Sequence, residues 1–132
     1  AIKAAIARLG IKKFAMATPY PFPVNEVEKK FIEDNGFKVL KCDGLDLTDN
    51  NILAPLPPSV IYRVAKSGDV PEADAVFISC TGIDALDVIE PLERDLGKPV
   101  ITSNQASFWH LFKMAKIGDS IRGYGRLLEE PR

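Results

Sequence analysis

Several residue types are scarce in this chain of 132 residues, and their scarcity excludes whole classes of site. There is one histidine, and the two cysteines, Cys42 and Cys80, stand far apart with no CxxC pair. Such spacing gives neither a disulfide framework nor a zinc knuckle, and a lone His110 has no cluster of metal ligands around it in the sequence. We therefore expect no metal site, and we interpret His110 as structural or exposed and Cys42 as a packing residue.

An excess of either charge and long apolar runs are also missing. The net charge is −1, so the chain has no basic field for nucleic acid. No apolar run approaches the roughly 20 residues that span a bilayer. The first ten residues, AIKAAIARLG, mix charged and apolar types, unlike the blocks of a signal peptide. We expect no nucleic-acid partner, no membrane partner and a cytoplasmic location.

What the sequence does contain is an alternation of helical and extended patterns. With 46% hydrophobic and 27% charged residues, the composition is that of an ordinary globular domain. Strict alternation with short connections predicts an α/β fold, in which a four-stranded parallel sheet carries helices on both faces. The pattern predicts strands over 12–17, 37–41, 74–79 and 98–102, and helices over 1–9, 24–35, 59–66, 83–96 and 106–116.

Further expectations concern the orientation and shape of two helices, the domain boundary and the extent of the chain. In the helix over 24–35, we expect Val27 and Phe31 to face the core and Glu28 to face solvent, and we expect Pro91 to kink the helix over 83–96. We divide the chain into an α/β domain over 1–116 and a tail over 117–132 that packs on a neighbouring domain or chain. Because the sequence starts without Met inside an amphipathic helix, we expect it to be part of a longer protein.

The stretch around Cys80 is the most informative part of the sequence. Residues 76–79 form a short apolar strand, Cys80 follows at once, and apolar residues then recur at helical spacing. We therefore expect the thiol to lie at a helix N-terminus, whose free N–H groups stabilise a thiolate or hold a carboxylate. The acidic residues Asp84 and Asp87 are expected to face solvent.

Other candidate site residues follow the predicted strands, because ligands of open parallel sheets bind beyond the carboxyl ends of the strands. Prolines frame Tyr20, whose O–H can donate to a carboxylate. Thr81 and Gly82 offer backbone N–H groups, and Gly82 allows a ligand to approach closely. Asn50 is either a ligand-binding amide or an ordinary turn residue.

Five segments, taken in order, resemble a known group of enzymes. They read ATPY with VN, DLTDN, FISCTG with LDVIEPLE, LGKPVITSNQASFWH, and GYGRLL. They are similar to the second half of maleate cis-trans isomerases and arylmalonate decarboxylases, within the aspartate/glutamate racemase superfamily, over nearly the whole chain. The resemblance implies one half of a pseudo-symmetric two-domain fold with its site between the domains. The first half, which has a cysteine position of its own, lies outside this sequence.

The resemblance implies a function and roles for particular residues. Cys80 matches the catalytic cysteine, which acts as acid, base or nucleophile, and Tyr20 and Asn50 match groups that bind the substrate. The expected activity is isomerisation of a small dicarboxylic acid without metal or organic cofactor. DLTDN places maleate isomerase ahead of arylmalonate decarboxylase or an Asp/Glu racemase. The expected partners are a small carboxylic acid and either the missing N-terminal half or a second copy. The alternative is a non-catalytic module or an inactive fragment.

Overall fold

The computed structural model describes residues 1–52 and 55–129, apart from the side chain of Asn50. No helix within these ranges is long and apolar enough to cross a membrane. The elements, in chain order, are α1 (Ile2–Arg8), β1 (Lys13–Thr18), α2 (Phe22–Asp34), β2 (Lys38–Gly44), the 3₁₀ turn η1 (Asn50–Ile52), α3 (Pro58–Gly68), β3 (Ala75–Ile78), the 3₁₀ turn η2 (Leu86–Val88), α4 (Ile89–Leu96), β4 (Val100–Thr102), α5 (Ser103–Met114) and α6 (Arg126–Glu129).

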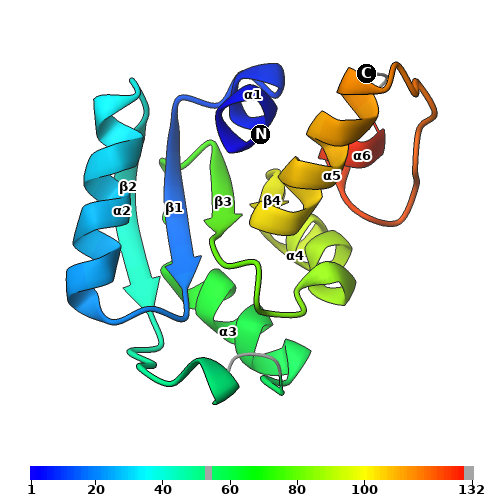
Figure 1. Ribbon diagram of the computed structural model, residues 1–132. Coiled ribbons are helices and arrows are strands. Elements are labelled where there is room, and N and C mark those ends of the chain that lie inside the picture. Colours follow the sequence, from blue (N-terminus) through cyan, green and yellow to red (C-terminus); the bar gives the residue numbers. More distant parts are fainter. Residues whose placement is uncertain (53–54, 130–132) are drawn as a thin grey trace.

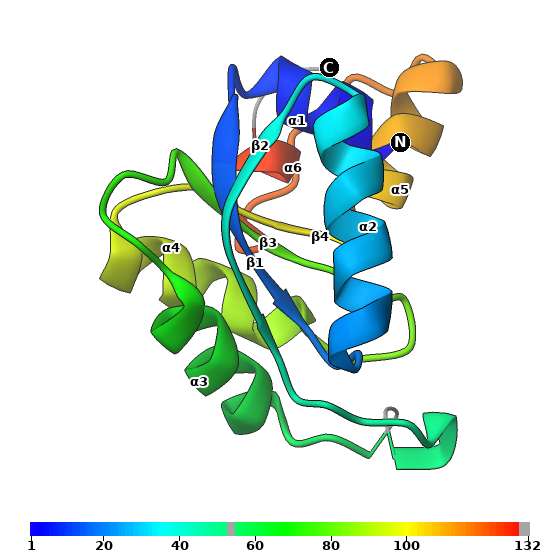
Figure 2. The same cartoon turned by 90° about the vertical axis from the view of Figure 1, so that its left-hand side faces the viewer.

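The four strands form one parallel sheet in the order β2-β1-β3-β4 (Figure 1). Seen from its edge, the sheet has α3 and α4 on one side and α1, α2 and α5 on the other (Figure 2). This confirms the predicted α/β class, with helices on both faces. It also means that the two central strands are covered on both faces, as their apolar sequences require.

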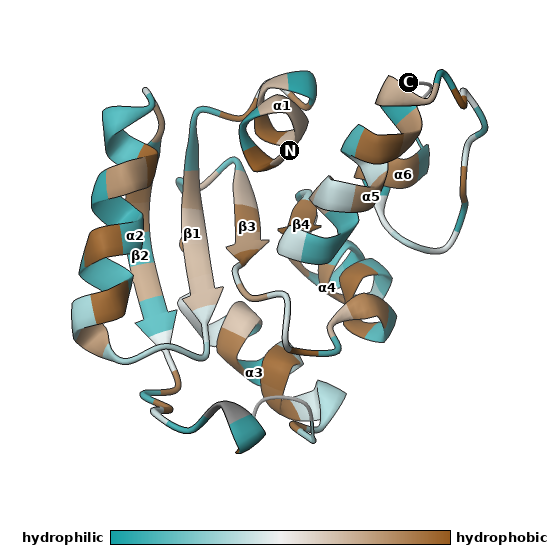
Figure 3. Cartoon of the chain, viewed as in Figure 1, coloured by the Kyte–Doolittle hydropathy of each residue, from teal (hydrophilic) through white to brown (hydrophobic). Residues whose placement is uncertain are grey.

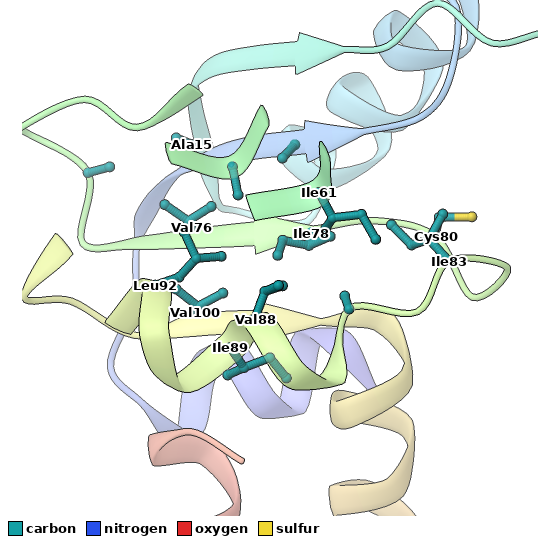
Figure 4. Packing of buried hydrophobic residues seen from close by; sticks show 14 residues of the cluster. Ala15, Ile61, Val76, Ile78, Cys80, Ile83, Val88, Ile89, Leu92 and Val100 are labelled. Carbon is teal, nitrogen blue, oxygen red and sulfur yellow. The ribbon is translucent and has the colours of Figure 1, made fainter. Parts of the chain in front are cut away.

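Alternate residues of each central strand supply two hydrophobic cores. On the α3 and α4 side, Val76 and Ile78 pack with Ile61, Leu92 and Val100, as Figure 4 shows. On the α1, α2 and α5 side, the core is built from aromatic and larger apolar groups; Phe14 and Phe77 meet edge to face with ring centroids 5.9 Å apart. The period of two along a strand therefore decides which helix layer each side chain meets.

Strand β2 is longer than its sequence pattern predicts. We predicted a strand over 37–41 and a loop from Cys42, but the parallel ladder with β1 continues through Cys42 to Gly44, which pairs with Thr18. Backbone pairing with a buried neighbour outweighs the low strand propensity of Asp43 and Gly44. Cys42 consequently lies within the sheet and is half-buried.

Helix α2 presents a different face to the core from the one we predicted. Val27 and Phe31 are 72% and 61% exposed, and α2 carries brown, hydrophobic bands along its length in Figure 3. The buried residues are Asn25 and Ile32, and Glu28 lies between them at helical spacing, facing inward. The hydrophobic stripe misled the prediction because two polar side chains of this helix find partners inside the fold.

The segment after Cys80 is also different from the prediction. Instead of a helix from residue 83, the chain makes an irregular turn, then η2, and α4 begins only at Ile89. Pro91 therefore lies in the first turn of α4, where its missing N–H costs nothing, and it produces no kink. Asp84 and Asp87 are exposed, as predicted.

The C-terminal segment packs on its own domain. Leu127 and Leu128 of α6 are buried, and the buried Glu93 carboxylate accepts a hydrogen bond from the Arg126 N–H at 3.0 Å. Gln105 donates to the carbonyl of Tyr124 at 2.5 Å. The predicted contact of residues 117–132 with another domain or chain stays a prediction, and residues 130–132 lie outside the described part of the chain.

Candidate functional site

The topology of the sheet brings two predicted site residues together. The chain leaves β1 toward the β2 edge but leaves β3 toward the β4 edge, so the carboxyl ends of β1 and β3 form the topological switch point of the sheet. Ligands of open α/β sheets bind at such a switch point. Tyr20 follows β1 and Cys80 follows β3, and the Ser79 N–H donates to the carbonyl of Ala17 at 2.9 Å between the ends of the two strands.

Cys80 lies at this switch point. Its side chain is at the edge of the core on the α3 and α4 side, 6% exposed, with the sulfur pointing away from the rest of the cluster (Figure 4). The Gly82 N–H donates to Sγ at 3.2 Å. The expectation that Cys80 lies at a helix N-terminus was wrong, because the first helical turn begins at Leu86. The tight turn at Thr81 and Gly82 supplies the donor instead.

Asn104, near the start of α5, holds that turn in place. Its Nδ2 donates to the carbonyl of Thr81 at 3.2 Å. α5 begins directly after β4, where we predicted a turn, because Thr102 and Gln105 form a capping box. The first turn of α5 therefore anchors the turn that carries Cys80.

Tyr20 faces the thiol. Its side chain packs against the core cluster that contains Cys80, and its phenol is close enough to the thiol to hydrogen-bond with it. Burial raises the pKa of the Tyr20 phenol, and the hydrogen bond to Cys80 and the nearby charge of Glu28 raise it further. The phenol is thus a protonated hydrogen-bond donor throughout the neutral range, which is the state needed to bind a carboxylate.

Glu28 is a member of the site that the sequence did not reveal. Its Oε1 accepts a hydrogen bond from the Ser79 hydroxyl, next to Cys80 in the chain. Its Oε2 is buried and has no hydrogen-bond partner among the described residues. Burial raises the pKa of the Glu28 carboxyl, and the Ser79 bond opposes that shift. In the sequence, Glu28 stands in a charged run and is indistinguishable from a solvent-facing residue.

The remaining predicted residues lie around this centre. Thr81 and Gly82 are exposed beside Cys80. Asn50 begins η1 beyond β2, but its side chain lies outside the described part, so its role stays a prediction. Burial, followed by the charges of Glu28 and Asp43, raises the pKa of the Cys42 thiol to about 11. That thiol is mostly un-ionised at neutral pH, consistent with a packing role.

A hollow of about 600 Å³ adjoins the thiol on the α5 side. Its walls are the turn over 80–86, the start of α5 and the C-terminal segment, with Phe108, Phe112 and Tyr124 among the lining side chains. Within residues 1–52 and 55–129, no three His, Cys, Asp or Glu side chains gather in a way that could hold a metal ion. The groups available for chemistry are therefore a thiol, a phenol, a carboxyl and backbone N–H groups.

Comparison with known proteins gives related sequences over nearly the full chain. A profile of the family described as arylmalonate decarboxylase matches residues 1–128. The arylmalonate decarboxylase of Bordetella bronchiseptica is 33% identical over 125 residues, which cover 92% of this chain and 52% of that protein. The maleate isomerase of Nocardia farcinica is 29% identical over 123 residues, covering 92% and 49%.

Solved structures agree with these relatives. A crystal structure of arylmalonate decarboxylase is 30% identical, with a TM-score of 0.88, over 96% of this chain and 57% of that chain. A cysteine-to-serine mutant of the Nocardia farcinica maleate cis-trans isomerase, with a covalently bound succinylcysteine intermediate, gives 25% identity and a TM-score of 0.95 over 99% and 54%. The chain spans about half the length of the relatives it matches. On the profile match over 1–128, this chain belongs to the arylmalonate decarboxylase family.

Proposed function

We propose that this chain is the cysteine-bearing half of an isomerase that acts on a small dicarboxylic acid without a cofactor, with maleate cis-trans isomerisation as the first assignment. One observation carries the proposal. The Cys80 sulfur lies at the switch point between two hydrogen-bond donors, the Gly82 N–H at 3.2 Å and the Tyr20 phenol. A thiol held in this way can react with a carbon whose carboxylate is bound beside it.

The substrate carboxylate is assigned to the donors around the thiol. In this proposal the Tyr20 O–H and the N–H groups of Thr81 and Gly82 bind one carboxylate, and the Asn50 amide adds a further donor. Binding the carboxylate fixes the adjacent carbon near Sγ, which converts a bimolecular encounter into a reaction within one complex. These roles rest on the exposure of Thr81 and Gly82 and on the placement of Tyr20.

Cis-trans isomerisation requires that the carbon–carbon double bond be converted transiently to a single bond, about which the molecule can rotate. In the proposed step, a lone pair of the Cys80 thiolate forms a C–S bond to one alkene carbon. The π electron pair moves to the neighbouring carbon, where the attached carboxylate delocalises it. After rotation about the single bond, that pair re-forms the double bond in the trans arrangement, and the C–S electrons return to sulfur. In the cysteine-to-serine mutant of the Nocardia farcinica relative, a sulfur–carbon adduct is present as a succinylcysteine, on a cysteine other than the replaced one.

Arylmalonate decarboxylation is the second candidate. It is favoured by the family profile over 1–128 and by the 33% identity to the Bordetella bronchiseptica enzyme. In this reaction the bond between the central carbon and one carboxylate breaks, carbon dioxide leaves, and the electron pair stays on carbon. The Cys80 thiol then donates its proton to that carbon, and the thiolate is reprotonated by solvent. Both candidates use the same sulfur and the same carboxylate site.

A second protein unit is proposed to cover the switch point. The chain spans about half the length of its relatives, and it carries uncovered apolar groups, such as Phe22 at 70% and Phe108 at 58% exposure. Isolated monomers rarely expose such groups together. We assign this cover to the remaining half of the protein or to a second copy, which would supply the opposite wall of the substrate site.

The test uses the complete protein that contains this chain. Conversion of maleate to fumarate is followed by absorbance, and carbon dioxide release from phenylmalonate is measured alongside it. Cys80→Ser is expected to lower the active reaction by about 10²-fold or more, and Cys42→Ser, the matched control, should leave it unchanged. Wild-type turnover by the Cys80→Ser protein would rule out the assigned role. Absence of both reactions in the wild type would rule out the function.

A further inference from the structure

A buried amide connects α2 with the loop that carries Tyr20. Asn25 is the fourth residue of α2 and is 6% exposed. Its Oδ1 accepts a hydrogen bond from the Thr18 hydroxyl at 2.6 Å, and its Nδ2 donates to the carbonyl of Tyr20 at 3.0 Å. A buried amide is costly unless both of its ends are paired, and here both are.

Thr18 completes the connection. The Thr18 hydroxyl oxygen accepts a hydrogen bond from the Tyr20 N–H at 3.2 Å while the hydroxyl donates to Asn25. The Tyr20 N–H is therefore bound to Thr18 and the Tyr20 carbonyl to Asn25, and these two side chains are bound to each other. Since Pro19 and Pro21 flank Tyr20, the backbone on either side also has a restricted φ angle.

The end of β2 packs closely against the Asn25 side chain and the Tyr20 carbonyl. A Cβ atom added at Gly44 would lie 2.5 Å from Asn25 Nδ2 and 2.6 Å from the Tyr20 carbonyl oxygen, so only glycine allows this approach. The backbone beyond Gly44 also bonds to the loop: the Leu45 N–H donates to the carbonyl of Thr18 at 3.0 Å. The loop is thus held by β1, α2 and β2 together.

We propose that Asn25 is a positioning residue that acts on the thiol through Tyr20. With the Tyr20 backbone fixed at both polar groups, the phenol is held against Cys80. Asn25 itself touches neither the sulfur nor the proposed substrate position. The catalytic part of this inference rests on the proposed function; the positioning part concerns only the protein's own groups and is measurable without turnover.

The variant that tests the positioning role is Asn25→Asp, which nearly preserves the shape of the side chain. The aspartate keeps an acceptor for Thr18 but places a second oxygen against the Tyr20 carbonyl, so the loop loses its donor. We expect the iodoacetamide alkylation rate of Cys80 to rise several-fold, because the phenol is packed against a thiol that is only 6% exposed. We expect kcat/KM of the complete enzyme to fall about 10²-fold, the usual effect of a small misplacement.

A double-mutant cycle separates positioning from general destabilisation. Both quantities are measured in Asn25→Asp, in Tyr20→Ala and in the double variant of the complete protein. If Asn25 acts through Tyr20, the two changes are strongly non-additive, and Asn25→Asp adds little once the phenol is gone. Asn35→Asp is the matched control, since Asn35 is the C-terminal cap of the same helix and its side chain bonds to the Phe31 carbonyl and to Lys3.

Each outcome bears on the proposal. An unchanged Cys80 alkylation rate in folded Asn25→Asp protein, or additive effects in the cycle, would overturn it. If Asn25→Asp does not fold by circular dichroism, Thr18→Val enters the same cycle, with Thr18→Ser expected to restore wild-type values because it keeps the hydroxyl. If the alkylation cycle is non-additive but the wild type turns over neither maleate nor phenylmalonate, positioning is upheld and the proposed function fails.

Discussion

Replacing Gly125 by alanine should detach the C-terminal segment from the domain. Gly125 has φ +83, in the left-handed region, and it lies against the start of α4. A Cβ added there would be 2.5 Å from Ile89 Cγ2, 3.1 Å from Gln105 Nε2 and 3.2 Å from Glu93 Oε1. Ile89 is fully buried and Glu93 is tied to the backbone of Val100 and Arg126, so these neighbours have little room to retreat.

The expected loss of stability in Gly125→Ala is the sum of two separate costs. An alanine held in the left-handed conformation costs about 1–2 kcal/mol, and overpacking a close-packed site costs about 1–3 kcal/mol more. Gly125→Ala should therefore lower the free energy of unfolding by about 2–5 kcal/mol. Gly123 is a matched control: its φ is +87, but the nearest atom to its added Cβ is Glu90 Oε2 at 3.9 Å. Gly123→Ala should show only the conformational cost of about 1–2 kcal/mol.

Urea unfolding followed by circular dichroism measures both variants against the wild type. The informative quantity is the difference between the two alanine variants, which removes the shared conformational cost. We expect Gly125→Ala to be the less stable by about 1–3 kcal/mol. Equal losses in the two variants would show that Gly125 is needed for its backbone angle alone, and that the packing of α6 described above is incorrect.

Three further predictions concern the site and its surface. Brief iodoacetamide treatment of folded protein should label Cys80 before Cys42, because burial raises the Cys42 pKa to about 11; mass spectrometry showing equal or reversed labelling would count against this. Glu28→Gln should raise the melting temperature at pH 7–8. The folded-state pKa of Glu28 is raised, so ionisation costs stability as pH rises through it, and the gain should vanish below about pH 4, where the carboxyl is protonated in both states. A gain that persists at low pH would refute the charge argument. Light scattering of the isolated 132-residue chain should show association with itself, and a stable monomer with full activity would contradict the proposed need for a covering unit.

The sheet and most of the helices were predictable because their signals are local. Apolar strands such as residues 75–78 and the stop signals Gly10, Gly36 and Gly97 need no tertiary information. The same locality explains the pairing of Tyr20 with Cys80: each follows a strand, and parallel strands end at one edge. The resemblance added the thiol's role, which strand patterns alone do not give.

The errors arose where tertiary partners outweigh local pattern. The charged run around Glu28 gives no sign that the Glu28 carboxylate accepts a hydrogen bond from the Ser79 hydroxyl. Nor does helical spacing after Cys80 reveal that Pro91 is best placed in a first turn, which moves the helix start to Ile89. The face of α2 was misassigned for the same reason as Glu28, since Asn25 is buried by hydrogen bonds and not by hydrophobicity.

Ser79 and Cys80 are neighbours in the chain but serve opposite sides of the sheet. The serine hydroxyl meets Glu28 of α2, whereas the cysteine joins the core beneath α3 and α4. A shift of β3 by one residue against β1 would exchange the two, placing a hydroxyl in the proposed site and a thiol beside a carboxyl group. A shift by two residues would restore the original sides. The residue that faces the proposed site is therefore set by the pairing register of β3: an odd shift presents Ser79 and an even shift presents Cys80. A single inserted residue could silence the site while leaving every helix in place.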